Sequence, residues 1–113
     1  MKLPNGEDAV VDIVKLRDYC LNLGHPEGRH KARVFQSALA MGREDAARLR
    51  TRLLAAARIE DSHFTGADEY GRLYTLDFTM RHREREATVR AAWIVRRGEN
   101  FLRLTTCFVL GGH

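Results

Sequence analysis

The sequence predicts an α+β fold, in which about three N-terminal helices pack on one face of a C-terminal antiparallel sheet of three to four strands. Two observations lead to this prediction. Up to about residue 58, apolar residues recur with the 3.6-residue period of amphipathic helices. From residue 72 onward they alternate with polar residues, which is the period of half-buried strands. The change of period divides the chain into a helical part and a sheet part.

The helical part is expected to contain three helices. The first covers residues 13–21 and can be capped by Asp12, whose carboxylate can accept a backbone N–H of the first turn. The second covers residues 29–41 and should end at Gly42. The third covers residues 44–58, with acidic residues in its first turn and arginines later, in agreement with the helix dipole.

The second helix begins with an unusual cluster of cations. Arg29, His30 and Lys31 occupy its first turn, and His25 lies in the preceding Pro-Gly turn. At 100° per residue, Lys31 falls at the border of the apolar stripe, while Arg29 and Arg33 point away from it. A helix N-terminus already favours anions. The cluster therefore indicates either a phosphate site or a basic helix start that is only solvated.

The sheet part predicts a meander. A short strand is expected within residues 59–64, followed by strands over 72–80, 87–95 and 101–110 with turns between them. In the last strand, one row of alternating residues should face the helices and reads Leu102, Leu104, Thr106, Phe108 and Leu110. Thr106 is the only hydroxyl in this row, and it would meet Lys31 at one end of the interface between helices and sheet.

The composition describes one soluble globular domain over residues 1–113. The net charge of +4 and the pI near 9.5 favour polyanionic partners. No apolar run approaches the roughly 20 residues of a membrane span, and the N-terminus lacks a secretory signal. Cys20 and Cys107 are interpreted as buried thiols of a reduced, cytoplasmic protein.

Six arginines and only two glutamates lie between residues 81 and 97. Such a strand pair can face phosphates, or it can be an edge hairpin that its charges keep from aggregating. Arg90 is the more interesting member, because it lies outside the Arg-Glu alternation of the turn. Trp93, on the same strand, is a core candidate that could alternatively stack on a base.

Neither a metal site nor a cofactor is expected. The acidic residues are scattered, and His25 and His30 do not have the spacing of a helical metal pair. The remaining candidate is a cationic and imidazole site. Such a site suits metal-independent phosphodiester chemistry, because RNA supplies its own nucleophile in the 2′-hydroxyl. His25 would act as general base or acid, with His30 as a second candidate. Lys31 would stabilise the transition state and Thr106 would orient the phosphate.

Four stretches of the chain resemble a known family. They are Lys-Leu-Arg-Asp-Tyr-Cys-Leu-Asn at 15–22, His-Pro-x-Gly-x-x-Lys-Ala-x-x-Phe at 25–35, Trp-Ile at 93–94 and Arg-Leu-Thr-Thr-Cys-Phe at 103–108. The chain resembles a small bacterial domain that occurs alone and as the tail of polymorphic toxins. That domain is similar in architecture to the barnase–EndoU–colicin–RelE superfamily of metal-independent ribonucleases.

The resemblance implies functional roles for the histidine of His-Pro, the lysine before alanine and the last threonine of Leu-Thr-Thr, which are His25, Lys31 and Thr106. It also implies a toxin of a toxin–antitoxin pair with a small antitoxin protein as partner, and it leaves a homodimer open. The chain departs from the family where the closing segment usually ends in tyrosine, because Phe108 stands there.

The leading hypothesis is therefore a cytoplasmic endoribonuclease-type toxin that cleaves RNA by 2′-hydroxyl attack. The residues expected to contact the RNA are Arg29, Arg90, Trp93, Arg96 and Thr105. Two alternatives stay open. One is a non-catalytic interaction module, such as an antitoxin or immunity-type partner, and the other is a nucleic-acid-binding domain that does not cleave.

Overall fold

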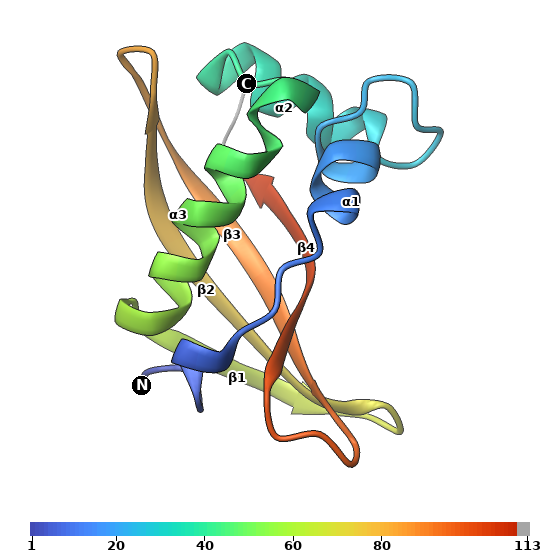
Figure 1. The fold of residues 1–113 in the computed structure, drawn as a ribbon, viewed down its shortest axis with the longest axis vertical. Coiled ribbons are helices and arrows are strands. Elements are labelled where there is room, and N and C mark those ends of the chain that lie inside the picture. The colour runs from blue at the N-terminus through green and yellow to red at the C-terminus, as the bar shows by residue number, and fades with distance from the viewer. Residues whose placement is uncertain (111–113) are drawn as a thin grey trace.

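The computed structural model describes residues 1–110, and its helices lie on one face of a four-stranded antiparallel sheet (Figure 1). The predicted α+β class is confirmed, since the helices are mostly N-terminal and the sheet is C-terminal. Strand order in the sheet follows the chain as β1-β2-β3-β4, so the sheet is a meander. Within the described residues, no helix has the length and apolarity that crossing a bilayer requires.

The helical part follows the predicted order with shorter pieces at its start. Its elements are η1 (Gly6–Asp8), α1 (Ile13–Lys15), the π-helical η2 (Leu16–Cys20), α2 (Arg29–Leu39), η3 (Arg43–Asp45) and α3 (Ala46–Ile59). The first predicted helix is thus α1 continued by η2. Asp12 caps it as expected, because its carboxylate accepts the N–H of Val14 at 2.9 Å.

The helix α2 ends earlier than predicted, so the assignment of its end to Gly42 is wrong. The turn is made at Ala40, whose φ of 53° is left-handed and whose N–H donates to the carbonyl of Gln36 at 2.9 Å. Periodicity did not reveal this end because alanine is a poor left-handed residue and a good helix former. The free carbonyl of Leu39 then accepts a hydrogen bond from Nδ1 of buried His82 at 2.8 Å.

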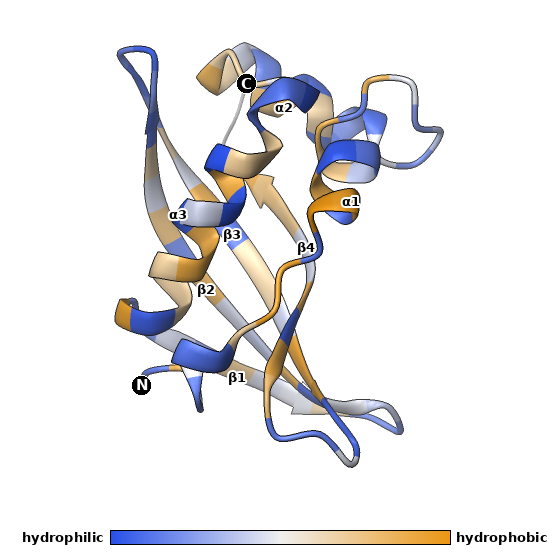
Figure 2. Cartoon of the chain, viewed as in Figure 1, coloured by the Kyte–Doolittle hydropathy of each residue, from blue (hydrophilic) through white to orange (hydrophobic). Residues whose placement is uncertain are grey.

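β2 and β3 are longer than predicted and the turn between them is tighter, whereas β1 lies further along the chain than predicted and β4 is shorter. The strands are β1 (Ser62–Ala67), β2 (Gly71–His82), β3 (Arg85–Arg96) and β4 (Leu102–Val109). Only Arg83 and Glu84 remain in the β2–β3 turn, with φ of 50° and 66°. Positive φ at both positions matches the twist of a two-residue hairpin. The turn is hydrophilic, as its blue tip in Figure 2 shows.

The core fills the space between the helices and the sheet (Figure 2). Phe35 of α2, Leu49 and Leu53 of α3 and Trp93 of β3 are all fully buried there. Each fully buried side chain of this size stabilises the fold by about 1.5–3 kcal/mol relative to an exposed one. The reading of the cysteines as buried free thiols is confirmed for both of them.

A β-bulge in β4 overturns the predicted core-facing row of that strand. Ala92 pairs with Thr106 and Trp93 with Leu104, so Thr105 is an extra residue without a partner. The bulge shifts the two-residue alternation by one position. After it, Cys107 and Val109 are the buried residues, whereas Thr106 and Phe108 are only half-buried. Thr106 therefore does not belong to the row that faces the core.

Candidate functional site

An open groove lies where η2 and the turn after it meet β4. Its volume is about 550 Å³, and it is lined by Val14, Lys15, Asp18, Tyr19, His25, Thr105 and Thr106. The bulge in β4 gives this groove its hydroxyls, because it turns Thr106 out of the core row and leaves Thr105 beside it. Two segments far apart in the sequence, residues 14–25 and 105–106, thus contribute to one site.

The imidazole of His25 is fixed by the turn that precedes α2. Its Nδ1 accepts the backbone N–H groups of Glu27 at 3.0 Å and of Gly28 at 2.9 Å. With Nδ1 accepting, the neutral ring carries its proton on Nε2, and Nε2–H is the group left to bind a ligand. The ring also stands edge-on to that of Tyr19, with centroids 4.8 Å apart. His25 is therefore a positioned hydrogen-bond donor at the groove.

Lys31 reaches the site from α2 through Tyr19. Its Nζ donates to the Tyr19 hydroxyl at 3.3 Å and lies 5.4 Å from the centroid of that ring. The same ammonium lies 6.0 Å from the ring centroid of Phe108 on β4. With its oxygen accepting from the ammonium, the hydroxyl of Tyr19 has its own hydrogen available for an anion in the groove. Lys31 and Tyr19 therefore form one cationic donor unit.

Thr105 and Thr106 are held in different ways. The hydroxyl of Thr105 donates to the carbonyl of Ala92 at 3.0 Å, which fixes the bulge. The hydroxyl of Thr106 has only a weak contact, 3.9 Å from Sγ of Cys20. Thr106 is therefore the hydroxyl that is free to bind a ligand.

Two buried thiols lie directly beneath the groove. A hydrogen bond from Cys107 lowers the pKa of Cys20 to about 7, against the effect of burial, and Thr106 and Lys31 contribute in the same direction. The same pairing, together with burial, raises the pKa of Cys107 above its ordinary value. The main cause is thus the hydrogen bond between the two thiols, and the charge of Lys31 makes the smallest contribution.

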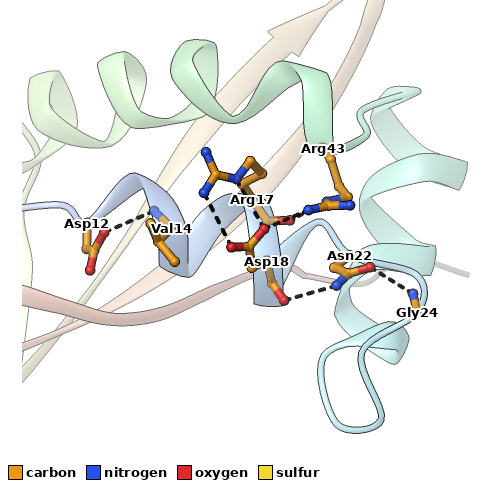
Figure 3. Close-up of polar contacts among 7 residues, drawn as sticks. All are labelled: Asp12, Val14, Arg17, Asp18, Asn22, Gly24 and Arg43. Carbon is orange, nitrogen blue, oxygen red and sulfur yellow. Dashed lines mark hydrogen bonds and ion pairs between the residues drawn. The ribbon is translucent and has the colours of Figure 1, made fainter.

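Asp18 is the carboxylate on the groove wall, and two arginines hold it (Figure 3). Its Oδ1 accepts from Nε of Arg17 at 3.1 Å and from Nη2 of Arg43 at 2.7 Å. These hydrogen bonds, first from Arg17 and then from Arg43, lower the pKa of the Asp18 carboxyl. The carboxylate is therefore ionised at neutral pH and is a weak proton acceptor.

The structure brings together part of the predicted catalytic set. His25 and Thr106 line the groove, and Lys31 lies one hydrogen bond behind it. His30 is exposed on α2 and does not line the groove. Arg29, predicted to contact RNA, is likewise exposed on α2.

The remaining predicted RNA contacts are dispersed. Thr105 lines the groove. Arg90 forms a two-point ion pair with Asp77, at 2.8 and 3.0 Å, which occupies its guanidinium. Trp93 is fully buried, so its ring offers no face for stacking in this structure. Arg96, at the end of β3, lines a different groove that includes Arg97.

Tyr19 and Lys15 are the site residues that sequence reasoning missed. Tyr19 recurs with Ile13, Leu16 and Cys20 at the spacing of a helix's apolar stripe, which is typical of core residues, yet it is only half-buried. Lys15 lines the same groove, and its Nζ donates to the carbonyl of Leu104 at 3.4 Å. The chain contains only three lysines, and two of them, Lys15 and Lys31, lie at this site. The rarity of lysine in this chain was the signal by which sequence reasoning could have singled out Lys15 as well as Lys31.

The fold and the groove define a small α+β protein with a donor-rich site between a helical segment and a sheet edge. Across residues 1–110, no group of three or more His, Cys, Asp and Glu side chains is placed to hold a metal ion. The chain belongs to the family described as "Domain of unknown function (DUF6883)", which matches residues 2–111. No curated protein matches the sequence, and no solved structure matches it.

Proposed function

We propose that the protein is a metal-independent endoribonuclease of toxin type that cleaves RNA by attack of the 2′-hydroxyl on the adjacent phosphate. The observation that supports this most is that Tyr19 and His25 meet Thr106 of the distant strand β4 at one groove, with Lys31 one hydrogen bond behind it. Positioned donors of this kind stabilise charge that develops on a phosphorane. The toxin role and a small antitoxin partner are supported by the sequence resemblance.

Each group has a role that follows from its hydrogen bonds. The Tyr19 hydroxyl, backed by the ammonium of Lys31, donates to a non-bridging phosphate oxygen. Nε2–H of His25 donates to a second oxygen, and the Thr106 hydroxyl orients the phosphate. The 2′-oxygen forms a bond to phosphorus, the bond from phosphorus to the 5′-oxygen breaks, and the products are a 2′,3′-cyclic phosphate and a 5′-hydroxyl. Water takes up the 2′-hydroxyl proton, because Nδ1 of His25 already accepts two N–H groups, and water supplies a proton to the 5′-oxygen as it leaves.

A second candidate function is RNA binding without cleavage. The observation that favours it is the weakness of the bases at the groove. Nδ1 of His25 already accepts two N–H groups, and Asp18 is held by arginines that lower its pKa. The groove is thus richer in donors than in acceptors for the 2′-hydroxyl proton. RNA binding without cleavage requires only the hydrogen-bond donors of the groove, because no proton has to be removed from the 2′-hydroxyl.

The test uses purified protein and end-labelled RNA with a chelator present. Cleavage should leave 2′,3′-cyclic phosphate ends, and a substrate with a single 2′-deoxy position should resist cleavage there. Lys31→Met and Thr106→Val should lose cleavage, while Lys2→Met, a substitution at an exposed lysine away from the groove, should not. Intact RNA that nevertheless binds the wild-type protein would establish the second candidate instead.

A matched cellular experiment tests the toxin role. Tightly controlled expression of the wild type should arrest bacterial growth, whereas His25→Ala and Lys31→Ala should not. Equal and harmless expression of all three folded proteins would contradict a toxin role.

A further inference from the structure

Half of β2 has an edge that no strand of the described chain covers. β1 pairs with β2 only over Arg72 to Leu76, so the part from Asp77 to His82 has β3 on one side and no strand on the other. The carbonyls of Thr79 and Arg81 face this open side, because they accept hydrogen bonds from α3 rather than from β3. In an antiparallel strand, the N–H of a residue points to the same side as its carbonyl. Thr79 and Arg81 therefore present both backbone groups to the open edge.

The helix α3 forms the other wall of a groove along this edge, with a volume of about 780 Å³. Apart from its two arginines, α3 contributes only small side chains to this wall, those of Ala47, Thr51 and Ala55. Arg52 spans the gap with Nη2 at 3.1 Å from the Thr79 carbonyl, and Arg48 does so with Nη2 at 3.4 Å from the Arg81 carbonyl. The groove is thus wide enough that only long side chains bridge it.

The groove is strongly cationic and continues around the β2–β3 turn. A second groove of about 430 Å³ shares Arg48 and Arg81 with the first. Together the two grooves are lined by five arginines and two glutamates, which are Arg48, Arg52, Arg81, Arg83, Arg85, Glu84 and Glu86. Glu86 is already bound to Nε of Arg81 at 2.8 Å. The surface therefore has an excess of positive charge beside a strand edge whose carbonyls at Thr79 and Arg81 are bonded only to arginine side chains.

The opposite edge of the sheet differs, because the N-terminal segment covers part of it. The N–H of Val10 donates to the carbonyl of Leu102 at 2.8 Å, and the N–H of Leu104 donates to the carbonyl of Val10 at 3.1 Å. β4 is thereby paired over this stretch. Natural proteins usually cover, shorten or charge an exposed edge. Val10 covers β4 beside Arg103, whereas the Asp77–His82 part of β2 has no described strand beside it and is lined by arginines.

We propose that this edge binds an extended, acidic segment of a protein partner, which adds to β2 as a further strand. Strand addition uses backbone hydrogen bonds for affinity and alternating side chains for specificity. The N–H groups of Thr79 and Arg81 would donate hydrogen bonds to carbonyls of the segment. Its apolar side chains would contact the small residues of α3, and its carboxylates would pair with Arg48 and Arg81. The phosphates of a nucleic acid could form ion pairs with the arginines. A nucleic acid has no peptide carbonyls, however, so it could not form the backbone hydrogen bonds of an added strand. The inference does not rest on the proposed ribonuclease function, since none of these residues lines the catalytic groove.

The test selects ten-residue random peptides by display on the wild-type protein and compares two charge reversals on α3. Arg48→Glu lies in the groove, and Arg58→Glu is a matched control, exposed on the same helix but outside both grooves. Selected peptides should carry Asp or Glu at alternate positions. Their affinity should fall about tenfold or more for Arg48→Glu and stay unchanged for Arg58→Glu. Hydrogen exchange of the Thr79 and Arg81 amides should slow when a selected peptide is bound.

Several results would overturn the inference. These are selection without acidic enrichment, equal loss of affinity in both variants, or unchanged exchange of the two amides. Binding of a labelled single-stranded RNA through Arg48, without any peptide binding, would make the groove a nucleic-acid surface instead. RNA cleavage should be the same in Arg48→Glu as in the wild type, so failure of this inference is distinguishable from failure of the ribonuclease proposal.

Discussion

Replacement of Lys31 by methionine separates a catalytic role from a structural one. The ammonium lies 3.3 Å from the Tyr19 hydroxyl, so a phosphate oxygen bonded to that hydroxyl would lie roughly 6 Å from the charge. At an effective dielectric constant of about 20, a unit charge at that distance is stabilised by about 3 kcal/mol. Loss of this stabilisation in the transition state should slow cleavage about 100-fold.

The same substitution should change stability very little. The hydrogen bond to Tyr19 is long and half-exposed, and its loss costs about 0.5–1 kcal/mol. Methionine keeps the aliphatic stem and can contact the rings of Tyr19 and Phe108 through sulfur, which offsets part of that loss. The melting temperature should therefore fall by less than about 4 °C.

The assay is single-turnover cleavage of labelled RNA, with thermal unfolding measured on the same preparation. Lys2→Met is the control for removal of a lysine charge elsewhere. Cleavage within about threefold of the wild type would refute the proposed role of the ammonium. A fall in melting temperature above about 8 °C would show instead that Lys31 supports the fold.

Three further predictions concern the bulge, a buried histidine and the groove carboxylate. Deletion of Thr105 should cost only about as much unfolding free energy in urea titrations as Thr105→Ala, about 1 kcal/mol, because removal of the extra residue leaves Leu104 opposite Trp93 and Thr106 opposite Ala92 and keeps Cys107 and Val109 on the core face; a cost above about 3 kcal/mol for the deletion alone would contradict the bulge. His82→Leu should cost about 2–4 kcal/mol by the same titration, because it leaves the carbonyl at the end of α2 and the carboxylate before α3 without their partner, and a cost below about 1 kcal/mol would be inconsistent with this. Asp18, whose pKa is lowered by Arg17 and then Arg43, contributes stability that is present above its unfolded pKa of about 4 and is lost as pH falls through the lowered value. Asp18→Asn should flatten the acid side of the stability profile, and an unchanged profile would show that the two arginines do not stabilise the carboxylate.

The helices and strands could be predicted because local periodicity determines them. The change of period from 3.6 to 2 separates the two halves of the chain, and Asp12 marks the first helix start. The end of α2 at Ala40 could not be predicted, because no glycine marks it and the left-handed turn depends on packing around it.

The candidate site was predicted only in part, and one reason for it was wrong. Thr106 was predicted as a site residue because it interrupted an apolar row of alternating residues in the last strand. The bulge at Thr105 shifts the alternation, so Thr106 does not belong to the core-facing row. Strict alternation gives no sign of an extra residue, although two consecutive threonines are consistent with one. Tyr19 was assigned to the core, since periodicity cannot tell a buried tyrosine from one whose hydroxyl meets Lys31 across 12 residues of chain.

Trp93 gives the protein a built-in optical probe. It is the only tryptophan of the chain, and it lies fully buried on β3 between Tyr74 of β2 and Leu104 of β4. Its indole N–H is the one buried side-chain polar atom without a partner among residues 1–110. Emission from this ring should therefore be that of an indole in an apolar, unhydrated environment, and it should shift to the red when the strands separate. Each variant described above can be followed through this intrinsic fluorescence without a label.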